Sequence, residues 1–198
     1  PRTGVLKTTD SLDTIGFFVL HYEDLERIFE VLRVHGTDYP LSNSALTNKK
    51  RQTKPAGRPW KVAFVKTHTW EYAPSYAQNA LTGWVKRLAD TDDIQIGDVD
   101  LPEILSKSHT IHSTIYDKTL SYYFKEEFKK DTLVSPIMKD LIRHGNGISV
   151  KQYQNALVQQ GAMCRAMETF FKDYDILLSL STAGEAPLRN EVELPDPA

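Results

Sequence analysis

The stretch Lys61-Val62-Ala63-Phe64-Val65-Lys66-Thr67 decides how this chain of 198 residues folds. Its apolar centre, bounded by lysines, is typical of a short buried strand. A helix is predicted next, with Pro74 in its first turn, where a missing backbone N–H costs nothing. A second strand is predicted at residues 94–101. This strand–helix–strand order favours a right-handed parallel crossover and therefore an α/β fold.

The predicted crossover helix carries a continuous apolar stripe, as a helix packed on a sheet requires. The stripe consists of Tyr76, Ala77, Ala80, Leu81, Trp84, Val85 and Leu88. In the second strand the apolar positions change phase. Ile94 and Ile96 point to one face, whereas Val99 and Leu101 resume one residue out of step. A β-bulge near Gly97 is predicted to absorb the extra residue.

Towards the N-terminus, residues 1–16 are rich in Thr, Asp and Gly and predict an ordered loop. A helix is predicted from about Tyr22, with Gly36 as its stop, because apolar residues recur at helical spacing. These residues are Leu25, Ile28, Phe29 and Leu32. Residues 37–59 are polar and contain Pro, Asn and Ser, which predicts a surface loop.

Towards the C-terminus the sequence is mostly helical. Helices are predicted at 103–130 (as one helix or two), 133–143 and 149–172. Gly145-Asn146-Gly147 is predicted to separate the last two. Residues 175–180 contain the run Ile176-Leu177-Leu178 and predict a buried strand that returns to the sheet. The polar tail at 188–198 is predicted to be mobile.

The composition is that of a soluble globular domain, with 40% hydrophobic and 25% charged residues. A net charge of -2 and a pI near 6.3 give no general attraction to nucleic acid or to anionic membranes. We find no membrane-spanning run and no signal-peptide pattern, so a cytoplasmic location is predicted. The single cysteine excludes an internal disulfide and a cysteine-based zinc cluster.

Two features could carry chemistry, and each has a plainer interpretation. His109 and His112 stand three residues apart on a predicted helix, a spacing that can place two imidazoles on one metal ion. No motif supplies a third ligand, so ordinary surface or pocket-edge histidines are favoured. Cys164 stands seven residues from both Leu157 and Phe171, which predicts a buried, inert thiol on the apolar stripe of its helix.

A basic cluster without an intervening acid lies in and just after the predicted surface loop. It consists of Lys49, Lys50, Arg51, Lys54, Arg58 and Lys61. Such a cluster could contact phosphates. It lacks a recognisable nucleic-acid-binding fold and belongs to an acidic protein, so a solvated loop is favoured. The sequence also has no phosphate-cradling glycine loop and no dinucleotide fingerprint.

Three separated segments resemble the amidase signature family in their order and spacing. They are Leu12-Asp13-Thr14-Ile15-Gly16 with Glu23-Asp24-Leu25 and Gly36-Thr37-Asp38; Lys61–Thr67 with Val99-Asp100-Leu101-Pro102; and Gly145–Tyr153 with Ala156, Arg165 and Asp173-Tyr174-Asp175-Ile176-Leu177-Leu178. The resemblance implies a single, incomplete amidase-like domain over residues 1–198, with a partial mixed sheet and flanking helices. It also implies hydrolysis of a carboxylic amide to an acid and an amine, without a metal or organic cofactor.

Members of that family hydrolyse amides with a lysine, a serine in a cis peptide and a nucleophilic serine, in a glycine- and serine-rich segment. This chain contains no Gly-Ser, Ser-Gly or Ser-Ser pair, so we expect no catalytic residue in it and place the missing segment before Pro1. The resemblance implies that the chain supplies scaffold and part of the pocket wall around a small-molecule amide. His112, Tyr116 and Ser181 are the candidate pocket residues. Alone, the chain is expected to be inactive.

Other parts of the sequence refine this interpretation. Tyr116 belongs to an aromatic cluster, with Tyr122, Tyr123, Phe124 and Phe128, most of which we expect in the core. The resemblance and the short carboxylate of Asp13 indicate a structural role, capping backbone N–H groups in a tight loop. Where the family has a Thr-Pro-Thr-like turn, this chain has Ser179-Leu180-Ser181, and the missing proline leaves the shape of that loop open.

Two alternative functions remain possible, and truncation of the sheet would have a consequence for association. The chain could be a non-catalytic binding or interaction module on an amidase-like scaffold. It could also bind nucleic acid through Lys49, Lys50 and Arg51. Because the chain ends soon after Ser181, we expect it to be truncated at both ends, and a cut sheet exposes its edges. Self-association, or binding of the missing enzyme portion, is therefore expected.

Overall fold

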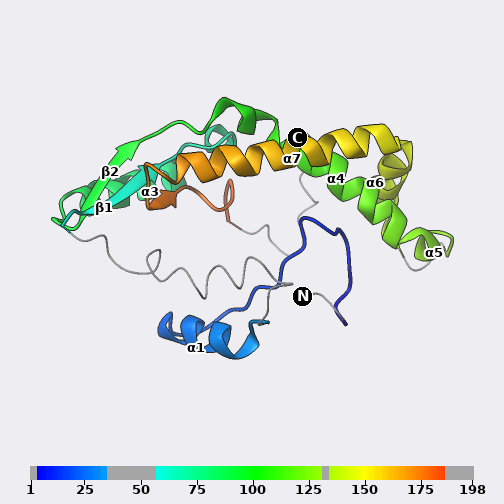
Figure 1. The fold of residues 1–198 in the computed structure, drawn as a ribbon, viewed down its shortest axis with the longest axis horizontal. Helices are drawn as coiled ribbons and strands as arrows, with labels where there is room; N and C mark the ends of the chain where they lie inside the picture. The colour runs from blue at the N-terminus through cyan, green and yellow to red at the C-terminus, as the bar shows by residue number, and fades with distance from the viewer. Residues whose placement is uncertain (1–3, 35–56, 131–133, 186–198) are drawn as a thin grey trace. The chain divides into compact units, whose positions relative to one another are not determined.

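A computed structural model describes residues 4–34, 57–130 and 134–185 of the chain (Figure 1). The chain divides into two compact units. Unit 1 contains the described parts of residues 1–53 and 116–147, and unit 2 those of residues 54–115 and 148–198. The predicted tail at 188–198 and all but the last three residues of the predicted loop at 37–59 lie outside the described residues.

Unit 2 contains a three-stranded sheet in the order β2-β1-β3. Its strands are β1 (Trp60–Phe64), β2 (Ile94–Asp98) and β3 (Ile176–Leu178). The helix α3 (Ser75–Ala89) connects β1 to β2, and α7 (Val150–Phe170) precedes β3. The α/β class and the parallel crossover are confirmed. The described sheet is not mixed, because both of its strand pairs are parallel.

The second strand contains no bulge, so that prediction is wrong. Trp60 pairs with Ile94 and the register continues without interruption to Phe64 opposite Asp98, with Ala63 opposite Gly97. The strand ends at Asp98, and only the N–H of Val99 still donates to the Phe64 carbonyl. The phase change in the sequence therefore marks the end of the strand, since residues beyond it no longer alternate between two faces.

The described part of unit 2 also contains short 3-10 helices at Trp70–Tyr72 and Glu103–Lys107. The second leads into α4 (Ser108–Tyr123), whose first half, up to Ile115, belongs to unit 2. After β2 the predicted helix at 103–130 is therefore divided into a 3-10 turn, α4 and a short α5 (Lys125–Phe128).

The core of unit 2 lies where α7 packs on the sheet (Figure 1). Buried Ala63 in β1 and buried Val65 just after it meet Phe170 from the end of α7, with Val99, Leu101, Met167, Tyr174 and Leu177 around them. The buried residues of α7 are Ala156, Met163 and Phe170. Cys164 is exposed. The prediction of a buried thiol is wrong because the buried line of the helix runs one residue earlier than the line through Leu157 and Phe171.

A bidentate ion pair joins the start of β1 to the start of β3. Arg58 Nη1 and Nη2 lie 2.7 and 2.9 Å from the two carboxylate oxygens of Asp175, and the backbone N–H of Lys61 donates to the same carboxylate at 2.9 Å. The hydrogen bonds from Arg58, opposed in part by burial and aided by Lys61, lower the pKa of Asp175 to about 2. Arg58, predicted as part of a solvated basic loop, instead holds two strands together.

Replacing Asp175 with Asn is expected to lower the free energy of unfolding of unit 2 above pH 4, and to have less effect at lower pH. A carboxylate whose pKa is lower in the folded state stabilises the fold above its unfolded pKa near 4, and this contribution is lost as the pH falls towards 2. Because Arg58 is partly exposed, we expect a loss of about 1–2 kcal/mol rather than the full value of the shift. Urea unfolding of both proteins between pH 2 and 6 measures the difference.

Asp173→Asn is the matched control, because Asp173 is exposed and forms no ion pair with the described residues. It should leave the unfolding midpoint and its pH dependence nearly unchanged. Equal losses in the two variants would show that the bidentate pair adds nothing beyond general surface charge.

Unit 1 contains α1 (Glu23–Leu32), the second half of α4, α5 and α6 (Pro136–Gly147). The predicted helix near Tyr22 is confirmed, although it ends at Leu32 and has no fully buried residue. Leu120, Val134 and Ile142 form the core of this unit, packed against Tyr116, Phe124, Phe128, Met138 and Leu141. The predicted aromatic packing is thus confirmed for three residues, whereas Tyr122 is exposed.

Gly145 and Gly147 lie in the last turn of α6 and do not form a linker, so that prediction is wrong. The reason for a glycine at position 145 is a close helix–helix approach. A Cβ at Gly145 would overlap the backbone carbonyl of Asp117 on α4 and lie 2.9 Å from Ser121 Cβ. Gly147 has no neighbouring atom within 4 Å of a Cβ position. The capping box of Ser149 and Gln152 then starts α7.

Candidate functional site

The carboxyl edge of the sheet is where ligands bind in parallel α/β folds, because loops and strand ends converge there. Lys66 and Thr67 follow β1, Val99 and Asp100 follow β2, and the Ser179–Ser181 segment follows β3. All belong to unit 2. The topology therefore collects a cation, hydroxyl groups and a carboxylate at one edge.

Lys66 is the fixed cation of this edge. Its Nζ lies 3.1 Å from Asp98 Oδ2, at the end of the neighbouring strand. The same ammonium lies 5.5 Å from the centre of the Phe64 ring and 5.8 Å from that of Trp70, distances at which cation–π attraction acts. Phe64 and Trp70 in turn pack edge to face. The lysine side chain is thus oriented by Asp98 and by the two rings, although it stays partly exposed.

Two histidines from different segments meet near this edge. The rings of His68 and His109 have centroids 5.8 Å apart. His112, one turn further along α4, is exposed. Among the described residues, no group of three or more His, Cys, Asp or Glu has the geometry of a metal site. The sequence singled out the pair of His109 and His112, whereas the structure pairs His109 with a histidine after β1.

The three predicted pocket residues lie on two elements. His112 and Tyr116 are one turn apart on α4, the first exposed and the second half-buried. Ser181 is exposed in the loop that follows β3. That loop is anchored to the start of α3, because the Tyr76 hydroxyl donates to Glu185 Oε1 at 3.0 Å. This hydrogen bond also raises the pKa of Tyr76.

Two adjoining cavities in unit 2 have volumes of about 390 and 470 Å³. Both are lined by Val99, Asp173 and Tyr174. The first extends over Lys61 and residues 95–98 of the sheet, and the second over Leu101, Pro102, Ala166, Thr169 and Phe170. Neither is lined by the three predicted pocket residues. Sequence reasoning missed these cavities, because their lining is brought together from β2, the segment before β3 and the end of α7, and no sequence motif connects these segments.

The interpretation of Asp13 as a structural residue is confirmed. Its carboxylate accepts hydrogen bonds from the backbone N–H groups of Thr8 and Thr9 at 3.0 and 3.1 Å. The Thr8 hydroxyl donates to the other oxygen at 2.5 Å. Nearby, the Tyr123 hydroxyl donates to Asp10 at 2.6 Å. Asp13 therefore holds the loop together, as a short carboxylate in a tight turn does.

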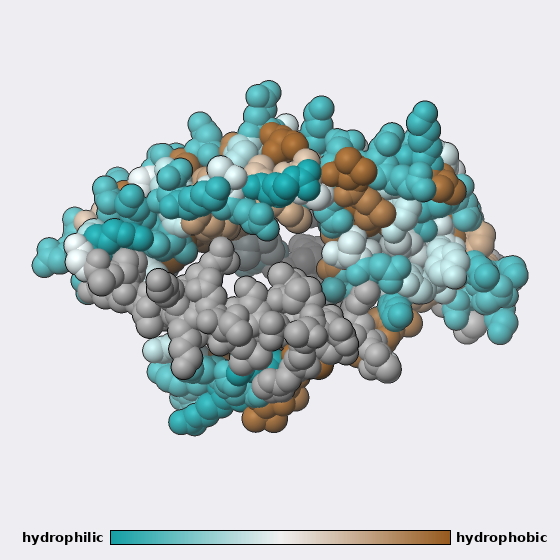
Figure 2. Space-filling model, in the orientation of Figure 1, coloured by the Kyte–Doolittle hydropathy of each residue, from teal (hydrophilic) through white to brown (hydrophobic). Residues whose placement is uncertain are grey.

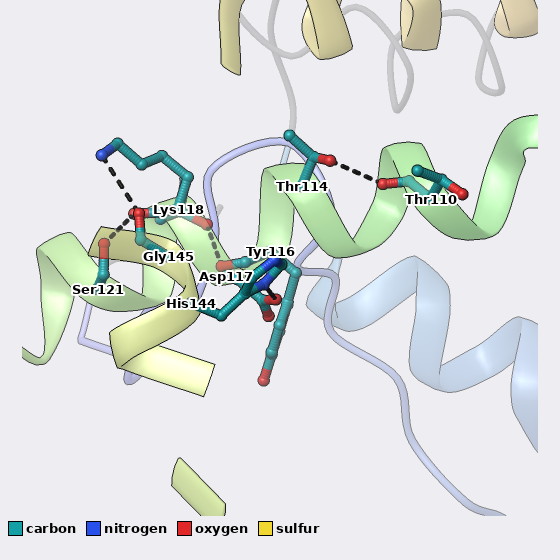
Figure 3. A network of polar contacts seen from close by, with 9 residues as sticks. Thr110, Thr114, Tyr116, Asp117, Lys118, Ser121, His144 and Gly145 are labelled. Atoms are coloured by element: carbon teal, nitrogen blue, oxygen red, sulfur yellow. Dashed lines mark hydrogen bonds and ion pairs between the residues drawn. The ribbon is translucent and has the colours of Figure 1, made fainter. Parts of the chain in front are cut away.

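A histidine–carboxylate pair in unit 1 was not predicted. His144 Nδ1, on α6, lies 2.6 Å from Asp117 Oδ2, on α4 (Figure 3). Figure 3 also shows Tyr116 on the same turn of α4 as Asp117. The two partners are 27 residues apart in the chain. No spacing rule connects them, so only the packing of the two helices reveals the pair.

On the face seen in Figure 2, the coloured residues are mostly hydrophilic, with separate hydrophobic patches among them. None of the described helices combines the length and apolar character needed to cross a bilayer. Residues with exposed apolar side chains include Phe18, Leu20, Val31 and Val158.

Comparison with known protein families gives a match over almost the full length of the chain. The family model described as Amidase matches residues 1–197. No match was found among curated proteins. The family match covers nearly the whole chain, including both units.

Proposed function

Because the chain belongs to the amidase family, we propose that it is a segment of an amidase-signature hydrolase that forms scaffold and part of the substrate pocket. The observation that carries this proposal is the family match over residues 1–197. At the level of the family, the chemistry is hydrolysis of an amide bond in a small molecule. The segment role and the pocket contribution are the parts that we add.

The sequence supports a non-catalytic role for these residues within the enzyme. A serine nucleophile needs an adjacent base and backbone N–H donors that stabilise the oxyanion, which close backbone approach provides. The chain contains no serine next to a glycine or another serine. We therefore place the reacting groups outside these 198 residues, and assign His112, Tyr116 and Ser181 to the wall of the pocket.

The first test compares two proteins, the 198-residue chain and the same chain extended by the coding region upstream of Pro1. Each is assayed with several aryl and aliphatic amides. We expect hydrolysis by the extended protein and none by the chain alone. Turnover by the purified chain alone would contradict the assignment of chemistry to other residues. An extended protein that binds amides without cleaving them would indicate the non-catalytic module.

The second test concerns the pocket wall. In the active, extended protein, Tyr116→Leu is expected to raise KM for aryl amides several-fold with little change in kcat, because an apolar wall binds substrate and transition state alike. Tyr122→Leu is the control, since Tyr122 lies on the same helix and is 67% exposed. Equal KM values in both variants would remove Tyr116 from the pocket.

A further inference from the structure

The pair formed by His144 and Asp117 has no role in the function proposed above and lies wholly in unit 1 (Figure 3). The side chain of Asp117 is 4% exposed, whereas that of His144 is 64% exposed. With Nδ1 of His144 directed to the carboxylate, the opposite edge of the ring, which carries Nε2, is accessible. A buried carboxylate therefore orients an imidazole that solutes can reach.

The backbone around the pair holds it in place. The close approach of Gly145 to the Asp117 carbonyl brings the two helices together one residue after the histidine. Lys118 Nζ donates to the Gly145 carbonyl at 3.3 Å, and the Ser121 hydroxyl donates to the Lys118 carbonyl at 2.8 Å. The approach of Gly145 and the Lys118 hydrogen bond connect α4 to α6 at this point, whereas the Ser121 hydrogen bond lies within α4.

The hydrogen bond determines which nitrogen carries the proton. A neutral imidazole has one N–H and one lone pair, and the nitrogen that faces a carboxylate must be the N–H. Nδ1 of His144 therefore holds the proton and Nε2 holds the lone pair. The charged groups beside the ring on α6, Asp140 and Arg143, pair with each other at 2.5 Å. Asp117 is thus the carboxylate that acts on the ring.

We propose that His144 is a nucleophilic site that accepts an acyl group at Nε2 from activated acyl compounds. The lone pair on Nε2 attacks the carbonyl carbon and forms an N–C bond. The bond from that carbon to the leaving oxygen breaks, and the leaving group departs with the electron pair. The proton on Nδ1 stays hydrogen-bonded to Asp117, whose charge stabilises the acylimidazolium until this proton is lost to solvent.

The test uses diethyl pyrocarbonate as the acyl donor on the full chain near neutral pH, with peptide mass spectrometry as the readout. His21 is the internal control, because it is exposed and its imidazole has no hydrogen bond or ion pair with the described residues. We expect His144 to be modified several-fold faster than His21. Asp117→Asn should slow His144 to the rate of His21 and leave His21 unchanged. Equal rates for both histidines in the unmodified protein would overturn the proposal.

A second measurement needs no variant, since Asp117→Asn could disturb the buried helix contact. Long-range nitrogen–proton correlation spectra of the wild-type chain identify the protonated ring nitrogen. We expect the Nδ1–H form for His144. The Nε2–H form would overturn the proposal, because the lone pair would then face the carboxylate. Neither measurement depends on amide hydrolysis, so its outcome is separate from that of the pocket assignment.

Discussion

Replacing Gly145 with alanine is expected to disrupt the packing of α4 against α6. In an exposed helix the same change stabilises by about 1 kcal/mol, because alanine restricts the unfolded chain and favours the helix. Here the new methyl group would overlap the backbone carbonyl of Asp117. A backbone atom cannot rotate aside as a side chain can, so the helices must separate. Overpacking of this kind costs about 1–3 kcal/mol and sometimes more. The substitution is therefore expected to lower the free energy of unfolding at this position, where in an exposed helix it would raise it.

The measurement is amide hydrogen exchange of α6 together with urea unfolding followed by circular dichroism. Gly147→Ala is the matched control, since it lies two residues away in the same helix and has open space at its Cβ position. We expect the control to be neutral or slightly stabilising and Gly145→Ala to lose protection throughout α6. If both variants were stabilised alike, the close approach of the two helices would be wrong.

The strand–helix–strand unit could be predicted because its signals are local. A strand such as β1, predicted at Lys61–Thr67 and observed at Trp60–Phe64, and a helix with an apolar stripe can each be recognised from a few neighbouring residues. The prediction of a bulge is wrong because it treated Val99 and Leu101 as strand residues, whereas the strand ends at Asp98. The spacing of apolar residues indicates which face of a strand or helix a side chain lies on. It does not indicate at which residue the strand or helix ends.

Contacts between distant segments could not be predicted. Gly145 looks like a turn residue in the sequence, and only the position of α4 shows that it is a packing residue. The pair of His144 and Asp117 and the pair of Arg58 and Asp175 join residues 27 and 117 positions apart. The residues of the candidate pocket also come from a helix and a loop that are distant in the sequence, so their arrangement in space could not be predicted. The role of Asp13 could be predicted because its hydrogen-bond partners are only four and five residues away.

Replacing Phe170 with alanine is expected to cost about 3–5 kcal/mol of the stability of unit 2, as truncation of a buried aromatic residue does. Phe170 is 8% exposed, packs on Ala63 and Val65, and stacks on the Tyr174 ring with centroids 4.8 Å apart. Together with Met167 it packs the end of α7 against the sheet, and it also lines one of the two cavities. The loss would therefore create a void between helix and strand that the backbone cannot close.

Phe171→Ala separates this effect from the loss of an aromatic ring in general. Phe171 is 42% exposed and touches Phe170 edge to face at 5.5 Å, so its removal should cost far less. Trp60, Trp70 and Trp84 are the chain's only tryptophans and all lie in unit 2, so tryptophan fluorescence during urea unfolding reports on this unit. The observed buried residues of α7, which end at Phe170, and the predicted stripe, which ends at Phe171, are offset by one residue. Comparing the two variants shows which of the two sets faces the sheet. A larger loss in Phe171→Ala would mean that the line through Leu157 and Cys164 faces the sheet after all.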